Sequence, residues 1–176
     1  MERIAKFRKV SEKRWIRDWC AAFDGALEGG QAAAQAEELY PALKLPQRAT
    51  AGSAGYDFYT PVDVHLEPGQ SIKIPTGVRV EMNEGWVLLI VPRSSLGFKY
   101  KLELNNTVGV IDSDYFYSDN EGHIFIKIVN SNPEGKPVDI CAGQAFAQGI
   151  FVMYGITEDD DSCGERNGGF GSTDAR

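Results

Sequence analysis

The sequence predicts a mainly β protein with a helical insertion near its start and a flexible arm at its end. Over residues 45–157, short alternating or apolar runs are separated by Gly, Pro, Asn and Asp, which is typical of an all-β barrel or sandwich. Within residues 11–44, apolar residues recur at the three- and four-residue spacings of helices. Residues 158–176 pass from an acidic linker to a Gly-rich end without an apolar run that could form a core. Residues 1–10 are expected to form a preceding strand.

Composition and charge restrict the class of protein. The 176 residues suit one domain, and 43% of them are hydrophobic, as in ordinary soluble globular proteins. The net charge of −7 argues against direct nucleic-acid binding, for which a basic surface is the usual footprint. A single nucleotide that arrives with a metal ion is compatible with an acidic protein.

Cysteine usage and hydropathy indicate the compartment. Cys20, Cys141 and Cys163 are odd in number and share no metal-ligand spacing, so we expect free thiols in a reducing environment. No apolar run approaches the roughly 18 residues of a membrane span, and the basic N-terminus does not resemble a signal peptide. We therefore expect a cytoplasmic protein with no membrane partner.

The first forty residues contain a strand pattern and then two helix patterns. Ser11 can cap a helix that ends at Gly29-Gly30, and a second helix is expected over residues 31–40, before Pro41. The first helix carries an apolar stripe of Trp15, Ile16, Trp19, Ala22, Phe23, Ala26 and Leu27. We expect this stripe to pack on the rest of the protein or on a partner subunit. A nucleic-acid role for the nearby basic residues is less favoured, because scattered charges are usually solvated.

Five strands stand out in the β region by alternation or by continuous apolar character. They are residues 71–74, 77–82, 87–91, 124–129 and 146–154.

The C-terminal arm contains the groups of a nucleotide lid. Arg166 offers a planar fork of donors suited to phosphate, and the glycines around Phe170 leave backbone N–H groups free to bind anions. Phe170 has no apolar neighbours in sequence, so its ring has a partner only if a flat group binds. Gly171, Ser172 and Thr173 follow and would face phosphates. The alternative interpretation is a disordered Gly-rich tail.

Two further stretches lie at turns of the β region. Asp57 follows Ala54-Gly55-Tyr56 at the start of a strand, where a plain turn is the alternative interpretation. Arg93, Ser94 and Ser95 follow an apolar strand and look like the first turn of a short helix. Their hydroxyl and N–H groups would form a phosphate seat, unless the serine is an ordinary helix N-cap.

Residues 106–115 indicate a nucleotide site more specifically than these two stretches do. Apolar residues flank Gly109, and the run ends in Asp112 and Tyr115. Such a hairpin can offer backbone groups to a base edge, with the glycine allowing close approach, while a carboxylate orients or deprotonates water. The alternative is an ordinary hairpin with an acidic turn. Further along, Gln148 places an amide where a core strand prefers an apolar side chain, although a solvent-facing position would explain it equally well.

Taken in order, these five stretches resemble the five motifs of the trimeric deoxyuridine triphosphatase (dUTPase) family over about residues 45–176. The resemblance implies a β-clip or jelly-roll-like barrel that assembles as a homotrimer with shared active sites, each closed by a neighbour's arm. The implied reaction is hydrolysis of dUTP to dUMP and pyrophosphate, with Mg²⁺ on the triphosphate.

The resemblance also assigns roles to residues. Asp112 matches the carboxylate that activates the water attacking the α-phosphorus, and Tyr115 matches the ring that packs under the deoxyribose. The uracil-reading hairpin is matched by Asn106, Gly109, Val110 and Ile111. Contacts to phosphates are matched by Arg93, Ser94 and Gln148, and indirect metal support through water by Asp57. Ser95, beside Ser94, is also expected to bind the substrate. The arm's clamp and stacking ring are matched by Arg166 and Phe170, followed by Gly171, Ser172 and Thr173.

Several features depart from the family pattern. Residues 116–121 lengthen the loop that leaves Tyr115, Ser95 stands where glycine is common, and Asp174 adds a negative charge near the expected γ-phosphate. The family gives no role to residues 11–40. Because such segments are plausible partner surfaces, a protein regulator could bind through residues 1–40 or 116–121.

Two rival functions follow from the same residues. The related dCTP deaminases share the barrel and an Arg-Ser-Ser stretch, but Asp112-Ser113-Asp114-Tyr115 and the arm favour a hydrolase. The second rival is a binding protein whose nucleotide site controls contact with a regulator.

Overall fold

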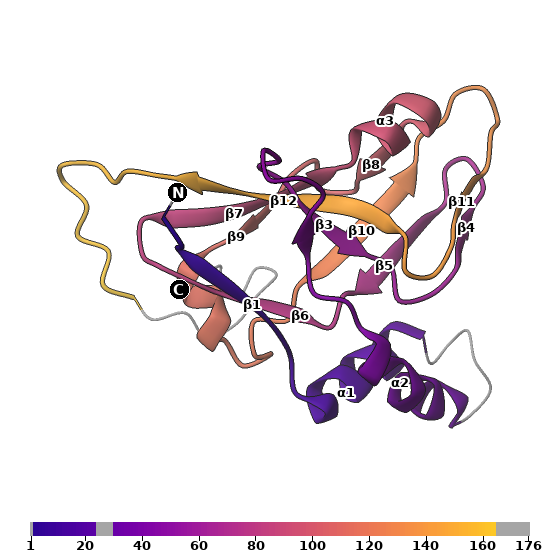
Figure 1. The fold of residues 1–176 in the computed structure, drawn as a ribbon, viewed down its shortest axis with the longest axis horizontal. Coiled ribbons are helices and arrows are strands. Elements are labelled where there is room, and N and C mark those ends of the chain that lie inside the picture. The colour runs from indigo at the N-terminus through magenta and orange to yellow at the C-terminus, as the bar shows by residue number, and fades with distance from the viewer. Residues whose placement is uncertain (1, 24–29, 165–176) are drawn as a thin grey trace.

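The computed structural model describes residues 2–23 and 30–164 (Figure 1). The expectation of a mainly β fold is confirmed. The strands are β1 (Ala5–Lys9), β2 (Gln47–Arg48), β3 (Tyr56–Tyr59), β4 (Val64–Leu66), β5 (Ser71–Pro75), β6 (Val78–Met82), β7 (Trp86–Pro92), β8 (Leu102–Leu104), β9 (Gly109–Ile111), β10 (Phe125–Asn130), β11 (Val138–Ile140) and β12 (Ala145–Met153). The helices are α1 (Glu12–Phe23), α2 (Gln31–Ala42), α3 (Ser94–Tyr100) and the 3₁₀-helix η1 (Ser113–Tyr117).

The strands form antiparallel sheets around a shared core. The largest sheet has the order β2-β3-β12-β7-β9, and the others are β5-β10-β8, β1-β6 and β11-β4. Among the described residues, these sheets do not close into one continuous hydrogen-bonded barrel. The edge strands of the largest sheet, β2 and β9, are only 2 and 3 residues long, so they offer little backbone for pairing with a neighbouring sheet.

The core follows the two-residue period of the strands. In β10, Ile126, Ile128 and Asn130 are buried whereas Lys127 is exposed, as expected for a strand with one face on the core. The side chains that share this core come from all the main sheets and include Phe58, Ile74, Leu88, Ile90, Leu104, Ile124, Val138 and Phe146. One core therefore joins the separate ladders into a single body.

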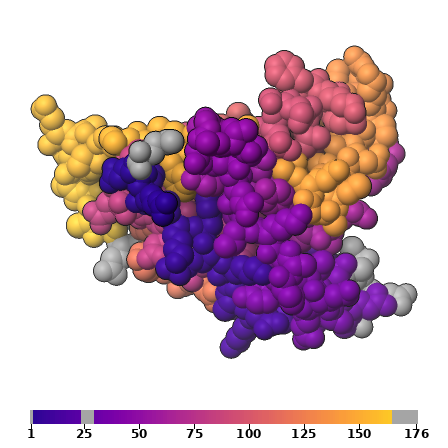
Figure 2. All heavy atoms as spheres, in the orientation of Figure 1, coloured from indigo at the N-terminus to yellow at the C-terminus, as the bar shows by residue number. Residues whose placement is uncertain are grey.

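The helical pair (α1 and α2) has a small core of its own. Trp15 and Trp19 are buried against Ala32 and Ala36 of α2. The Trp15 indole N–H donates to the Ala36 carbonyl oxygen at 2.8 Å, which satisfies the one polar atom of that ring. Figure 2 shows the pair as a lobe on the lower right of the molecule.

This lobe packs on the protein's own β region, as expected for its apolar stripe. Gly77 has a φ of +70°, and a Cβ there would lie 2.4 Å from Leu43 Cδ1 and 3.3 Å from the Trp15 ring. A glycine is therefore required where the lobe meets the chain before β6. The stripe residues Ala26 and Leu27, and the predicted helix end at Gly29, lie outside the described residues.

Helix α2 runs further than the sequence predicts. It continues through Pro41 to Ala42 instead of ending before the proline. Pro41 removes one helical hydrogen bond, the one that an N–H at this position would donate to the Glu37 carbonyl oxygen, and the helix ends one residue later. The Lys9 ammonium donates to the carbonyl oxygens of Tyr40 and Pro41 at 2.9 and 3.0 Å, which compensates the helix end.

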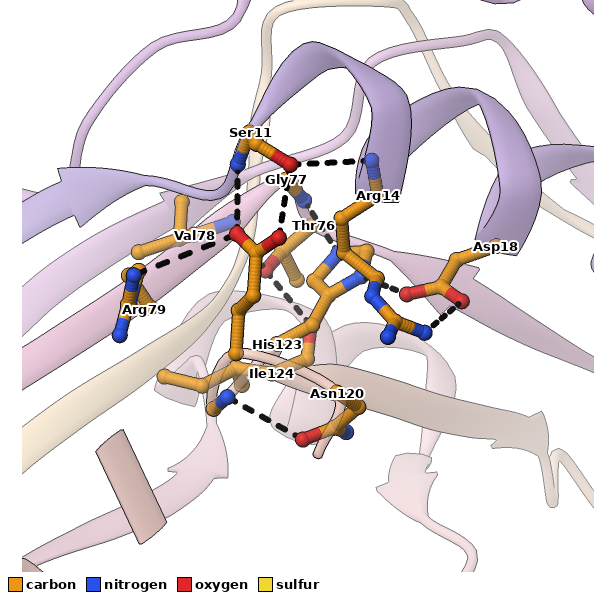
Figure 3. Close-up of polar contacts among 12 residues, drawn as sticks. Ser11, Arg14, Asp18, Thr76, Gly77, Val78, Arg79, Asn120, His123 and Ile124 are labelled. Carbon is orange, nitrogen blue, oxygen red and sulfur yellow. Dashed lines mark hydrogen bonds and ion pairs between the residues drawn. The ribbon is translucent and has the colours of Figure 1, made fainter. Parts of the chain in front are cut away.

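A buried histidine links the lobe to the β region. The exposed fraction of His123 is 0%, and its Nδ1 lies 2.6 Å from a carboxylate oxygen of Asp18 in α1 (Figure 3). Its Nε2 accepts a hydrogen bond from the Gly77 backbone N–H at 2.8 Å. A backbone N–H can only donate, so Nε2 carries no proton and the ring is neutral. Burial lowers the pKa of His123, although the Asp18 carboxylate opposes that shift.

We expect the protein to lose stability as the pH falls through the ordinary histidine range. A histidine whose pKa is lowered by folding contributes stability that is complete above about pH 6.5 and is lost as the pH falls toward the folded-state pKa. The melting temperature, measured from about pH 8 to about pH 5, should therefore drop on the acid side. His123→Gln, which keeps an acceptor and a donor, should flatten this drop.

The other histidine provides a matched control. His65 is exposed, and its hydrogen bonds to the carboxylates of Asp139 and Glu67 raise its pKa. A raised pKa contributes stability that is present at low pH and lost as the pH rises, so His65→Gln should leave the acid-side drop in place. If the melting temperature of His123→Gln fell on the acid side as much as that of the wild type, His123 would not be the cause of the drop.

Within the described ranges, no helix is long and apolar enough to cross a membrane. Cys20, Cys141 and Cys163 lie in these ranges and form no disulfide there.

Candidate active site

Three of the predicted site residues meet on the largest sheet. Asp57 of β3 pairs with Gln148 of β12, which in turn pairs with Val91 of β7. Arg93 directly follows β7, and its Nε lies 3.1 Å from a carboxylate oxygen of Asp57. The Gln148 amide donates to the Pro92 carbonyl oxygen at 3.1 Å. The predicted stretches around Asp57, Arg93 and Gln148 therefore form one cluster. We call it the phosphate-side cluster (Asp57, Arg93, Ser94, Ser95 and Gln148).

Gln148 is half-buried in this cluster, so its amide lies neither in the core nor fully in solvent. A Cβ at Gly55 would lie 2.4 Å from the Gln148 side-chain oxygen. The glycine therefore leaves the space that the amide occupies. This close contact also gives Ala54-Gly55-Tyr56 a role beyond that of a plain turn.

Ser94 and Ser95 open helix α3 beside Arg93. The N-cap is Arg93, which has an extended backbone and makes no side-chain cap bond. Ser94 is the first helical residue, so the interpretation as an ordinary Ser N-cap is wrong. Both serines are exposed, next to the half-buried guanidinium of Arg93. An exposed pair of hydroxyls beside a cation is suited to an anionic ligand.

The predicted hairpin of residues 106–115 lies at the edge of the same sheet. Strand β9 pairs with β7 through Gly109–Ile90, Val110–Leu89 and Ile111–Leu88. It is the outermost strand, so its other side offers backbone groups that the sheet does not use. Asn106 and Val110 are exposed. A Cβ at Gly109 would lie 3.1 Å from the Ile90 Cβ, so this glycine also has a packing reason.

Asp112 and Tyr115 follow this edge strand. Asp112 is half-buried and is the N-cap of η1, and its carbonyl oxygen accepts a hydrogen bond from the Tyr115 N–H at 3.2 Å. The exposed fraction of Tyr115 is 6%. Its hydroxyl donates to the His123 carbonyl oxygen at 2.8 Å and accepts from the Asn120 amide at 2.7 Å. The carboxylate and the ring therefore stand one helical turn apart at the sheet edge.

One chain does not bring the two groups of residues together. Arg93 follows Pro92 at the end of β7, whereas Asp112 follows Ile111, which pairs with Leu88 near the start of that strand. The register therefore separates the catalytic carboxylate predicted at Asp112 from the phosphate-side cluster along β7. The arm residues Arg166, Phe170, Gly171, Ser172, Thr173 and Asp174 lie outside the described residues.

Sequence reasoning missed the residues that hold Tyr115. Asn120 and His123 both bond its hydroxyl, and Ser118 donates to its carbonyl oxygen at 2.7 Å. The sequence contained one signal for this contact. Asn120-Glu121-Gly122 is typical of a turn, and a turn here would return the chain toward Tyr115. In the part of the chain that the structure describes, no group of three or more His, Cys, Asp or Glu side chains is placed to hold a metal ion.

A family model for dUTPases matches residues 42–174. The chain belongs to the dUTPase family. The dUTPase of Lactococcus lactis is 42% identical over 136 residues, which cover 76% of this chain and 89% of that protein. The crystal structure of a Streptococcus mutans dUTPase has 39% identity and a TM-score of 0.57, and covers 65% of this chain and 88% of that one.

A dUTPase from Staphylococcus bacteriophage 80alpha, determined with dUPNHPP, is also similar. It has 27% identity and a TM-score of 0.53, and covers 73% of this chain and 90% of that chain. The dUTPase match begins at residue 42, so β1, α1 and most of α2 precede it.

Proposed function

We propose that this protein hydrolyses dUTP to dUMP and pyrophosphate. The observation that carries the proposal is the arrangement at the sheet edge, where Asp112 stands between edge strand β9 and the buried ring of Tyr115. An edge strand can read a base, a buried ring can support a sugar, and a carboxylate between them can act on the adjacent phosphate. The names and structures of the related dUTPases support the same substrate.

In the proposed reaction, Asp112 acts as the general base. Its carboxylate takes a proton from a water whose oxygen forms a bond to the α-phosphorus. The bond from that phosphorus to the bridging oxygen of the β-phosphate breaks, and pyrophosphate leaves. Tyr115 packs under the deoxyribose, where a 2′-hydroxyl would not fit. Asn106 and the backbone of β9 contact the uracil.

The phosphate-side cluster holds the triphosphate. Arg93 supplies a cation, and the hydroxyls of Ser94 and Ser95 and the amide of Gln148 supply neutral donors. Arg166, Phe170, Gly171, Ser172 and Thr173 would close over the nucleotide. Mg²⁺ would neutralise charge on the phosphates, and a carboxylate such as Asp57 fits a hard cation that keeps most of its waters. The Asp57–Arg93 ion pair favours such an indirect role.

We propose that the active form is a homotrimer with shared sites. The support is the separation of Asp112 from Arg93 along β7, because a site that needs both must draw them from different chains. Exposed apolar side chains at the end of the large sheet, such as Met153 and Ile156, provide surface for such an assembly.

The direct test is pyrophosphate release from dUTP with Mg²⁺, measured beside UTP, dTTP and dCTP. We expect kcat/KM for dUTP to exceed that for each competitor by at least about 100-fold, since the competitors add a hydroxyl or methyl group or change the base edge. Ammonia release from dCTP would instead identify a deaminase. Tight dUTP binding without release would favour the binding-protein function, with a regulator acting through residues 1–40 or 116–121.

A further inference from the structure

We infer that Asn120 is a positioning residue that fixes the Tyr115 ring, and that helix α1 holds Asn120 in place. Residues added outside the common dUTPase core would thereby set the discrimination between deoxyribose and ribose nucleotides. This inference rests on the proposed function, because it concerns the ring that we place under the sugar. It is carried by the contacts of the loop 118–123 on both of its sides.

On its inner side, the loop surrounds the Tyr115 hydroxyl. The His123 carbonyl oxygen can only accept, so the phenol must donate to it, at 2.8 Å. The phenol oxygen then accepts from the Asn120 side-chain amide, at 2.7 Å. Tyr115 is buried, so these two partners fix the direction of its hydroxyl and limit tilting of its ring.

Asn120 is itself held in one orientation. Its side-chain oxygen accepts from the Gly122 N–H at 3.1 Å, and it shares the single proton of the Ser118 hydroxyl, 2.7 Å away, with the Tyr115 carbonyl oxygen. A backbone N–H can only donate, so the oxygen must face Gly122 and the NH₂ group must face Tyr115. Turning the amide over would place two donors against each other. The asparagine is therefore a rigid link between the loop backbone and the phenol.

On its outer side, the loop is held by the start of α1. The Glu121 carboxylate accepts from the Ser11 N–H at 2.8 Å and from the Ser11 hydroxyl at 2.7 Å. Arg14 donates to the Asp119 carbonyl oxygen at 2.6 Å. The residues on both sides of Asn120 are thus bonded to Ser11 and Arg14, at the start of α1.

The charge state of Glu121 is consistent with this attachment. Burial raises the pKa of its carboxyl group, but the bonds from Ser11 and the charges of Arg79 and Arg14 outweigh that effect and leave the pKa below its ordinary value. The carboxylate is therefore ionised at neutral pH, as acceptance of both Ser11 bonds requires. Arg79 also donates to the Phe116 carbonyl oxygen at 2.6 Å, which holds the start of the segment.

The two segments that depart from the family pattern thus contact each other. Residues 11–40 precede the dUTPase match, and residues 116–121 lengthen the loop after Tyr115. A longer loop loses more conformational freedom when it is ordered, and here α1 supplies the contacts that order it. We therefore assign α1 the task of keeping the lengthened loop, and with it Asn120, against Tyr115.

The test is a double-mutant cycle of Asn120 and Tyr115 in which discrimination between the deoxyribose and the ribose nucleotide is measured. The quantity measured is kcat/KM for dUTP divided by kcat/KM for UTP. Asn120→Ala removes one hydrogen bond to the phenol and should lower this ratio about 3- to 10-fold. In a Tyr115→Phe background, where the phenol is absent, Asn120→Ala should lower it no further. Equal loss in both backgrounds would overturn the inference, because Asn120 would then not act through Tyr115.

A matched control separates positioning from loss of stability. Asn132 lies in the loop between β10 and β11, and its side-chain oxygen also accepts two hydrogen bonds, here from the backbone N–H groups of Glu134 and Lys136. Asn132→Ala should lower the melting temperature without changing the ratio. Should Asn120→Ala not fold, Asn120→Asp keeps the acceptor oxygen and replaces the amide donor by a carboxylate oxygen, which adds a negative charge and cannot donate to the phenol. An unchanged ratio in a folded Asn120 variant would contradict the inference.

The outer contacts and the dependence on the proposed function can be tested separately. Glu121→Gln weakens the attachment to Ser11 and should lower the ratio in the same direction by about 2- to 5-fold. Absence of dUTP hydrolysis by the wild type would disprove the proposed function alone. The ratio would then be measured as the Kd of UMP over that of dUMP by calorimetry. A ratio unaffected by Asn120→Ala would then disprove the positioning role.

Discussion

Replacing Asp112 by asparagine should lower kcat for dUTP by about 1,000-fold while leaving the fold intact. General-base catalysis contributes about 100- to 10,000-fold in enzymes, and an amide cannot accept the proton of the attacking water. Asparagine has nearly the same size, and its backbone carbonyl oxygen can still accept the hydrogen bond from the Tyr115 N–H. The measurement is pyrophosphate release under saturating dUTP, with circular dichroism and melting temperature as checks on folding.

The neighbouring carboxylate provides the control for this substitution. Asp114 lies in the same 3₁₀-helix and is exposed. Asp114→Asn removes the same charge two residues away and should change kcat by no more than about 3-fold, because exposed charges act weakly through water. Comparable losses in the two variants would indicate a general charge effect instead of a base at Asp112.

The separation of the two half-sites extends this prediction to the assembly. Arg93→Ala and Asp112→Asn should each inactivate the homotrimer, since every shared site needs both residues. Mixed trimers contain some sites that draw an intact Arg93 and an intact Asp112 from different chains. Mixing the two variants after mild dissociation should therefore restore part of the activity. A site formed within one chain would show no recovery.

Local patterns were sufficient to predict much of the fold. The alternation of residues 77–82 corresponds to β6, and the apolar run of residues 87–91 corresponds to β7. Trp15 and Trp19 are buried, as a helical stripe predicts. These features depend on the period of neighbouring residues, which a single sequence displays directly.

Features that depend on distant contacts could not be predicted in the same way. The register of β9 on β7, which separates Asp112 from Arg93, is set by packing across strands. Residues 116–121 read only as a longer loop, because the partner that orders them lies about a hundred positions earlier in the chain. His123 gave no signal, since its burial follows from the docking of α1.

Gly122→Ala should lower the free energy of unfolding by about 3 kcal/mol and kcat/KM for dUTP by about 10-fold. Gly122 has a φ of +68°, and an added Cβ would lie 2.7 Å from the Tyr115 carbonyl oxygen and 2.8 Å from the Phe116 Cα. Both neighbours are backbone atoms, so the loop itself must move. That movement would displace Asn120, which accepts the Gly122 N–H, and would loosen Tyr115. Urea unfolding and steady-state kinetics give the two measurements.

Gly135 separates the two causes of this loss. Its φ is +77°, but a Cβ there would have no atom within 4 Å. Gly135→Ala therefore has the cost of the left-handed backbone alone, about 1 kcal/mol, and should leave kcat/KM unchanged. The difference between the variants measures the collision with the backbone of η1. Equal losses of stability with full activity in both variants would contradict this prediction. The loop would then move aside without disturbing Tyr115, and the close approach of Gly122 to the backbone of η1 would not set the position of the ring.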